Sequence, residues 1–184
     1  GKTVAVQGMG NVGAPLIRML LDKGVAGVVA SDIDAGTVAR VCKEISDDRL
    51  QASTERPGDH GVLAAECDIL SPCATGAILN PETIPTIRAR IVCGAANNQL
   101  EDSERDDRLL HERGVLYVPD FLTNRMGIVN CANEQHGYVK QDPLIERHLS
   151  RTWEHSIHRA ALRVFAEAKE IGRPPAWVAV RMAD

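Results

Sequence analysis

A chain of 184 residues with a formal net charge of −4 and 44% hydrophobic residues has the size and composition of one large globular domain, or of a domain with an appendage. Only 3% of the residues are aromatic and no basic stripe is present, which argues against nucleic-acid binding, and apolar runs such as Val25–Ala30 are too short to span a membrane. Five cysteines, none in a C-x-x-C pair, favour a reducing, cytoplasmic location over a disulfide scaffold or a zinc site.

The first strand is predicted very close to the start of the chain. Val4–Val6 is a short apolar run that stops at glycines, which is typical of a buried strand. It follows Gly1 almost directly, with no initiator methionine or signal peptide, so we expect a domain cut from a longer protein. Val12–Lys23 has helical spacing, and the next apolar run, Val28–Ser31, predicts a second strand that ends at Asp32.

The middle of the chain repeats this alternation less regularly. A helix is predicted over Ala35–Ile45 and another over Ser103–Arg113, with Ser103 as its cap. Residues 46–64 are polar and hold at most a short strand near Ala52. Ile84–Arg90 is expected to be a weak helix or turn. Further strands are predicted at Cys67–Ser71, Ile91–Cys93 and Val115–Val118.

Short apolar strands that alternate with helices indicate a parallel sheet covered on both faces. We therefore expect an α/β fold: a doubly wound, Rossmann-type parallel sheet of about six strands, followed by C-terminal helices. Helices are predicted over 126–139, over 142–171 and over Ala176–Ala183. The charge run Glu101–Arg108 is expected on an exposed surface.

The turn after the first strand carries the most specific motif, Gly8-Met9-Gly10-Asn11-Val12-Gly13. Its context is complete, because a strand precedes it, a helix follows it, and Asp32 ends the next strand. Gly8 permits the sharp turn, Gly10 lets the backbone approach a pyrophosphate, and Gly13 lets the helix pack on the strand. The free N–H groups at the helix start, which include those of Asn11 and Val12, favour a phosphate. The sequence therefore predicts a dinucleotide site.

Asp32 indicates which dinucleotide binds. Its carboxylate can accept hydrogen bonds from the adenosine ribose hydroxyls and would repel a 2′-phosphate. No Arg or Lys occurs at positions 33–36 to accommodate that phosphate, and Ile33 is assigned to the same adenosine site. We predict NAD as the cofactor, in preference to NADP.

Three later strand ends also carry unusual sequences, Ser71–Gly76, Gly94–Gln99 and Pro119–Asn124. Small residues let a flat ring approach the backbone, and asparagine side chains can pair with a carboxamide such as that of nicotinamide. The same asparagines are also typical of turns, and the pattern alone does not decide between the two interpretations.

These segments resemble the C-terminal, NAD-binding domain of the Glu/Leu/Phe/Val dehydrogenase superfamily, and the leucine and phenylalanine dehydrogenase branch most of all. The matching segments are Val4–Gly13, Glu66–Ala74, Gly94–Leu100 and Tyr117–Asp120. The resemblance implies residues 1–139 as the dinucleotide-binding domain. It implies residues 140–184 as a helical extension that packs on this domain and towards an absent N-terminal catalytic domain.

The resemblance implies oxidative deamination of an apolar, leucine-like L-amino acid to its 2-oxo acid, with hydride transfer to NAD. It assigns the cofactor wall to Ala74, Thr75, Ala95, Ala96 and Asn97. It places Asn124 beside the nicotinamide, and Ile128 and Cys131 against the substrate side chain. The partners it implies are a small amino or oxo acid and, for the whole protein, further copies in a homo-oligomer.

The chain also departs from this family. Arg125 and Met126 stand where the family usually has Ala-Gly, close to the expected substrate position. The family's catalytic lysines and aspartate belong to the N-terminal domain, and nothing here matches their motifs, so no catalytic residue is predicted in this chain. An NAD-binding regulatory module without dehydrogenase activity is the alternative, and a hydroxy-acid dehydrogenase is a weaker one. No metal is expected, since His155 and His158 suggest no third ligand.

Overall fold

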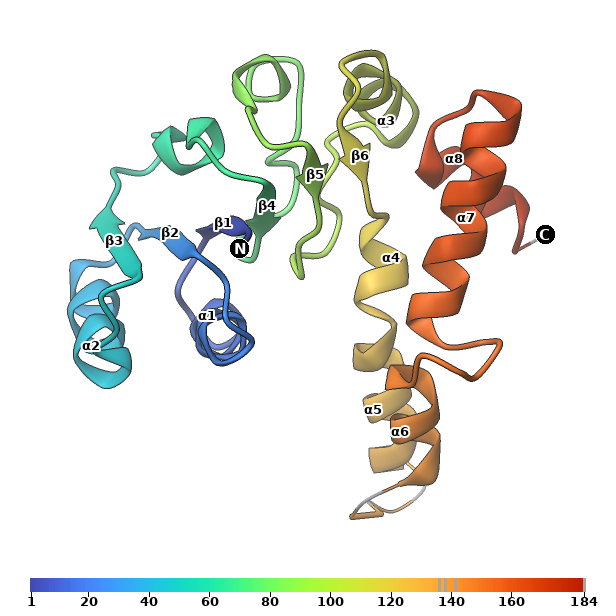
Figure 1. Ribbon diagram of the computed structural model, residues 1–184, viewed down its shortest axis with the longest axis horizontal. Coiled ribbons are helices and arrows are strands. Elements are labelled where there is room, and N and C mark those ends of the chain that lie inside the picture. The colour runs from blue at the N-terminus through green and yellow to red at the C-terminus, as the bar shows by residue number, and fades with distance from the viewer. Residues whose placement is uncertain (136, 138, 141, 184) are drawn as a thin grey trace.

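The chain forms one six-stranded sheet in the computed structural model, which describes residues 1–135, 137, 139–140 and 142–183 (Figure 1). The strands lie in the order β3-β2-β1-β4-β5-β6, and all neighbours run parallel. The crossover from β3 to β4 carries the chain to the other side of β1, which is the doubly wound α/β arrangement predicted from the sequence. The strands are β1 (Thr3–Gln7), β2 (Gly27–Asp32), β3 (Leu50–Thr54), β4 (Ile69–Pro72), β5 (Ile91–Val92) and β6 (Leu116–Tyr117).

Two apolar cores cover the two faces of the sheet (Figure 1). Val4 and Val6 of β1 are buried in the core beneath α1 and α2, while Ala5 belongs to the opposite core. This alternation follows from the two-residue period of a strand, and burial on both faces explains why Val4–Val6 are all apolar. The elements on the two faces are α1 (Gly13–Asp22) and α2 (Ala35–Ile45) on one, and η1 (Gly61–Ala64), η2 (Ile84–Thr86) and α3 (Ser103–Glu112) on the other.

Helix α3 begins one residue earlier than its sequence suggests. Asp102 is the N-cap, and its Oδ1 accepts a hydrogen bond of 2.8 Å from the N–H of Arg105. The prediction that Ser103 caps this helix is therefore wrong. The Asp102 carboxylate accepts hydrogen bonds from the free N–H groups, and its negative charge is stabilised by the helix dipole. The expectation that the charge run Glu101–Arg108 is exposed is wrong for two of its residues, because Asp106 and Asp107 are buried.

Five further helices in the described part of the chain follow β6 and extend along that end of the sheet (Figure 1). They are α4 (Asp120–Thr123), α5 (Arg125–Gln135), α6 (Pro143–Leu149), α7 (Ile157–Ile171) and α8 (Pro175–Arg181). The helix predicted over 126–139 corresponds to α5, which ends at Gln135; residues 137 and 139 are not helical, and 136 and 138 lie outside the described residues. None of the described helices is long and apolar enough to cross a membrane.

The single helix predicted over 142–171 is wrong, because two serines divide it. Ser150 and Ser156 both have extended backbone, and the Oγ of Ser156 caps α7 by accepting from the N–H of Arg159 at 3.2 Å. Serine hydroxyls compete with helical hydrogen bonds by bonding nearby N–H groups, whereas the apolar stripe continues across the break and conceals it. His155 consequently lies in the connection rather than on a helix.

Candidate dinucleotide site

Two glycines allow β1 and α1 to pack closely. Gly8 has a φ of +92°, and a Cβ at this position would lie 2.7 Å from the Cβ of Ala74. A Cβ on Gly13 would overlap the carbonyl oxygen of Gly8. Neither contact leaves room for a side chain, so these positions must be glycine for the turn to form.

Gly10, at the outer part of the same turn, faces open space instead. Apart from its chain neighbours, no atom of the described residues would lie within 4 Å of a Cβ on Gly10. Asn11 and Val12 complete the turn, and no side chain caps the first N–H groups of α1. Because uncapped N–H groups at a helix start carry the positive end of the helix dipole, this surface can hold a phosphate group.

Asp32 lies against the glycine turn from the end of β2. Its Oδ2 accepts from the N–H of Met9 at 2.7 Å, and its Oδ1 accepts from the N–H of Asp34 at 3.0 Å. Each carboxylate oxygen has a second lone pair that can accept from a hydroxyl group. Asp32 can therefore hold a ribose while it also fixes the turn, and Ile33 beside it is 64% exposed.

A cavity of about 230 Å³ opens beside Asp32. It brings together residues from β1, from the end of β2 and from the loop after β4. Five of the predicted residues line it: Gly8, Asp32, Ile33, Ala74 and Thr75. Its place at the carboxyl ends of the strands is the usual ligand position of a doubly wound sheet.

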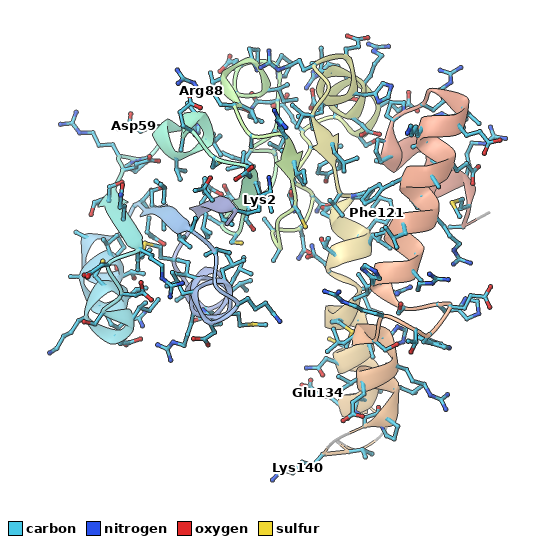
Figure 2. The ribbon with its side chains drawn as sticks, in the orientation of Figure 1. Lys2, Asp59, Arg88, Phe121, Glu134 and Lys140 are labelled. Atoms are coloured by element: carbon cyan, nitrogen blue, oxygen red, sulfur yellow. The ribbon has the colours of Figure 1, made fainter. Side chains whose placement is uncertain are left out.

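The outer wall of this cavity, which follows β3, is not predicted from the sequence. Glu55, Pro57 and His60 line it, together with Asp59, which Figure 2 shows in the segment between β3 and η1. Glu55 folds the segment back, because its Oε1 accepts from the N–H of Val62 at 2.7 Å. The short strand expected near Ala52 corresponds to β3 (Leu50–Thr54), and its carboxyl end is the signal that would have placed these residues at the same edge of the sheet.

The loops after β4 and β5 touch each other. The N–H groups of Ala95 and Ala96 donate to the carbonyl oxygen of Pro72 at 2.9 and 3.0 Å. A Cβ on Gly94 would overlap Pro72, so this approach requires a glycine. The small residues of these loops are thus explained in part by the packing of one loop on the other.

Asn97 and Asn124 join the ends of two strands. The Nδ2 of Asn124 donates to the carbonyl oxygen of Ala96 at 3.1 Å and to the Oδ1 of Asn97 at 2.9 Å. Both hydrogens of this carboxamide are used, so a ligand would meet its Oδ1 as an acceptor. Asn98, with a φ of +51°, supplies the turn. The turn interpretation therefore holds for Asn98, whereas the cofactor-site interpretation of Asn97 and Asn124 stays a prediction.

Ile128 and Cys131 lie farther along, on α5. They are three residues apart and both exposed, with 74% exposure for Ile128. Ile128 lines a mostly apolar groove of about 410 Å³ between α5 and α6, whereas the cavity beside Asp32 contains neither residue. Ile128 and Cys131 thus lie outside the cavity beside Asp32.

Arg125 extends towards the connection between α6 and α7. Its Nη2 donates to the carbonyl oxygen of His155 at 2.8 Å, and burial lowers the pKa of its guanidinium. The bulk of this side chain, which departs from the family pattern, is therefore directed to the segment between Ser150 and Ser156. Arg125 thus links α5 to the connection between α6 and α7 through this hydrogen bond.

Three neighbouring features fit the chemistry of a dinucleotide: the glycine turn, the uncapped start of α1 and the cavity beside Asp32. The turn offers N–H groups without side-chain obstruction, and the cavity offers a carboxylate to a ribose. With the 3-2-1-4-5-6 strand order, these features define a Rossmann-type domain of the dinucleotide-binding class.

The chain belongs to the Glutamate/Leucine/Phenylalanine/Valine dehydrogenase family, whose profile matches residues 1–183. It is 38% identical to leucine dehydrogenase of Geobacillus stearothermophilus over 184 residues, which is 100% of this chain and 46% of that protein. It is 37% identical to valine dehydrogenase of Streptomyces albus, covering 100% of this chain and 47% of that protein. The family resemblance stated from the sequence is confirmed.

The crystal structure of L-tryptophan dehydrogenase from Nostoc punctiforme has the same fold, with a TM-score of 0.85 and 36% sequence identity. The alignment covers 100% of this chain and 51% of that one. The chain thus spans about half the length of the relatives that it matches.

Proposed function

We propose that the chain is the NAD-binding domain of an L-amino-acid dehydrogenase that oxidises an apolar amino acid to its 2-oxo acid. The observation that carries the proposal is the glycine turn beside the cavity at Asp32, in a chain similar over its whole length to leucine and valine dehydrogenases. NAD, when bound, supplies the acceptor for the substrate hydride.

Each part of the site has a separate task in this proposal. The turn and the start of α1 bind the pyrophosphate through N–H groups, and Asp32 with Ile33 holds the adenosine ribose and disfavours a 2′-phosphate. The loops after β4, β5 and β6 orient the nicotinamide through Ala74, Thr75, Ala95, Ala96, Asn97 and Asn124. Ile128 and Cys131 on α5 contact the substrate side chain, whose apolar character they match.

Deamination needs further groups, which we assign to another part of the protein. A base must take a proton from the amine, and cations must hold the carboxylate and polarise the developing carbonyl. We propose that these groups lie in an N-terminal catalytic domain and that the whole protein is a homo-oligomer. A small amino or oxo acid then binds between the two domains.

The test has two parts. The 184-residue chain should bind NADH at least about tenfold more tightly than NADPH in a fluorescence titration, because the Asp32 carboxylate repels a 2′-phosphate. The same chain should produce no NADH from leucine, whereas the complete reading frame should oxidise leucine or valine. Tighter NADPH binding would refute the cofactor assignment, and deamination by the 184-residue chain would refute the division of the site.

A regulatory module that binds NAD without dehydrogenase activity is the second candidate. The Arg125-Met126 pair, in place of the family's usual Ala-Gly, is the feature that favours it. A complete reading frame that binds NADH but oxidises none of the apolar L-amino acids would establish this alternative and overturn the enzymatic proposal.

A further inference from the structure

A second, larger cavity lies at the β6 end of the sheet, between α3, α4 and α8. Its volume is about 560 Å³, and it shares no lining residue with the cavity beside Asp32. Its walls differ in character, with hydrogen-bond acceptors at the floor and guanidinium groups at the rim. Nothing in the proposed dinucleotide site uses these walls.

The floor carries two buried acceptors, Gln99 and Asp107, which we call the acceptor floor. Asp107 is 1% exposed; its Oδ2 accepts from the N–H groups of Ala176 and Trp177 at 3.0 and 3.1 Å, and its Oδ1 has no partner among the described residues. Gln99 is fully buried, and its Oε1 is likewise without a partner there. Because buried polar atoms are nearly always hydrogen-bonded, this floor is suited to a donor group, and its charge favours a cationic one.

Arg173 and Arg181 line the same cavity, and we call this pair the guanidinium rim. Their guanidinium carbons lie 5.4 and 4.9 Å from the centre of the Trp177 ring, which holds both side chains in place. No carboxylate among the described residues forms an ion pair with either one. Guanidinium groups held in this way are suited to a carboxylate, which they can bind through two parallel hydrogen bonds.

The rest of the lining is mixed, with Glu104, Arg108 and Asp120 beside apolar side chains. Leu100 and Val180 line the cavity, together with Phe121, which extends from the start of α4 towards α7 and α8 (Figure 2). Phe121 is 51% exposed and Val180 is 53% exposed. A ligand with an apolar body would cover this surface and be stabilised by its removal from water.

We propose that this cavity binds a free amino acid with an apolar side chain. The ammonium group donates to the acceptor floor, the carboxylate accepts from the guanidinium rim, and the side chain covers the apolar wall. A simple amine would leave the guanidinium rim without a partner, and a simple carboxylate would leave the acceptor floor without one. A nucleotide fits less well, because the guanidinium groups already lie over the Trp177 ring on which a base would stack.

Gln99 connects this cavity to the loop after β5. Its Nε2 donates to the carbonyl oxygen of Ala96 at 2.9 Å, and the same oxygen accepts from the Nδ2 of Asn124. An amino acid that bonds to Gln99 therefore acts on a network that the proposed function assigns to the nicotinamide. The expected consequence is a changed NADH affinity, which rests on the proposed function, whereas leucine binding does not.

The test is isothermal titration calorimetry of the 184-residue chain with L-leucine, without dinucleotide. Saturable binding with a dissociation constant in the millimolar range is expected. Asp107→Asn and Arg181→Gln should each weaken it at least tenfold, whereas Arg40→Gln, on the distant helix α2, should not. Asp32→Ala should lose NADH binding and keep leucine binding, so that the two proposals fail separately. Thermal unfolding of each variant verifies its fold, and Arg181→Gln remains informative if Asp107→Asn unfolds.

Analogues identify the ligand class. Removal of the ammonium group, in 4-methylpentanoate, or of the carboxylate, in 3-methylbutylamine, should abolish measurable binding. The proposal is overturned if leucine does not bind at concentrations up to about 50 mM. It is also overturned if either analogue binds as tightly as leucine, or if both variants bind leucine with unchanged affinity. Binding of AMP that Arg181→Gln weakens, with no leucine binding, would instead identify a nucleotide site.

Discussion

The β1–α1–β2 unit and the helices after β6 position their functional groups in different ways. In the first region main-chain N–H groups form the candidate site together with the Asp32 carboxylate, and Gly8 and Gly13 are required because neighbouring atoms leave no space for a Cβ. In the second region, side chains fix helix ends: Asp107 bonds the start of α8, Ser156 caps α7, and Arg125 ties α5 to the following connection.

This difference predicts different tolerance to substitution. An overlap between a new Cβ and a main-chain carbonyl cannot be relieved by a rotamer change, so it must displace a strand or a helix. A lost side-chain hydrogen bond at a helix end costs only about 1 kcal/mol and leaves the path of the chain intact. The glycine turn should therefore be the least tolerant part of the molecule.

Gly13→Ala is expected to have the largest effect. Because its Cβ would overlap the Gly8 carbonyl, we expect a loss of more than about 3 kcal/mol of unfolding free energy and a fall in NADH affinity of roughly 100-fold. Gly10→Ala meets no protein atom and should weaken NADH binding without changing stability. Urea unfolding and NADH fluorescence titration measure the two quantities.

Gly127→Ala, in α5, is the matched control for these substitutions. A Cβ there has no neighbour within 4 Å among the described residues, so the helix should gain up to about 1 kcal/mol. If Gly13→Ala is as stable as Gly127→Ala, the close packing of β1 and α1 does not set the glycine requirement.

Asp107→Asn should produce the next largest effect, and it depends on pH. Burial raises the pKa of Asp107 from 3.8 to about 6, although the nearby His111 lowers it. The folded state thus holds the Asp107 proton more tightly than the unfolded chain does. The resulting contribution to the free energy of unfolding is fully present below about pH 4 and is lost as the pH rises to about 6. At pH 7 the asparagine variant, which keeps an acceptor for α8, should be more stable by up to about 3 kcal/mol.

The measurement is urea unfolding of both proteins between pH 4 and pH 7. Other carboxylates titrate in both, including Asp68, whose pKa the Lys2 hydrogen bond lowers to about 2, so the difference between the proteins isolates Asp107. A difference that stays constant across this range would show that Asp107 is not a buried, destabilised charge.

The contrast between the two regions also explains what the sequence could predict. The β1–α1–β2 unit was predicted almost to the residue, because its glycines, its helical spacing and Asp32 all act on near neighbours in the chain. The Asn97–Asn124 pair bridges 27 positions, and spacing alone cannot bring such residues together. β3 was predicted only as a possible short strand near Ala52, because only Leu50 and Ala52 in it are apolar and its edge position exposes the rest.

The acidic residues of α3 show the same limit. Asp106 and Asp107 belong to a charge run that is typical of an exposed helix face, and both are buried. Asp107 is buried because α8, almost 70 residues later, places the N–H groups of Ala176 and Trp177 on its carboxylate. The local pattern predicted the exposure correctly for most of the run. It could not show that α8 covers Asp107, because that contact is a tertiary feature.

The smallest effect is expected from Ser156→Ala, which decides between one helix and two over 142–171. In a continuous helix the change to alanine would stabilise the protein, because alanine has the higher helix propensity. With Ser156 as the buried cap of α7, it should instead cost about 1 kcal/mol of unfolding free energy. Ser103→Ala is the matched control, since Asp102 holds the cap of α3 and the serine hydroxyl there should be dispensable. Equal stability of the two variants, measured by urea unfolding, would contradict the assignment of Ser156 as the residue that starts α7.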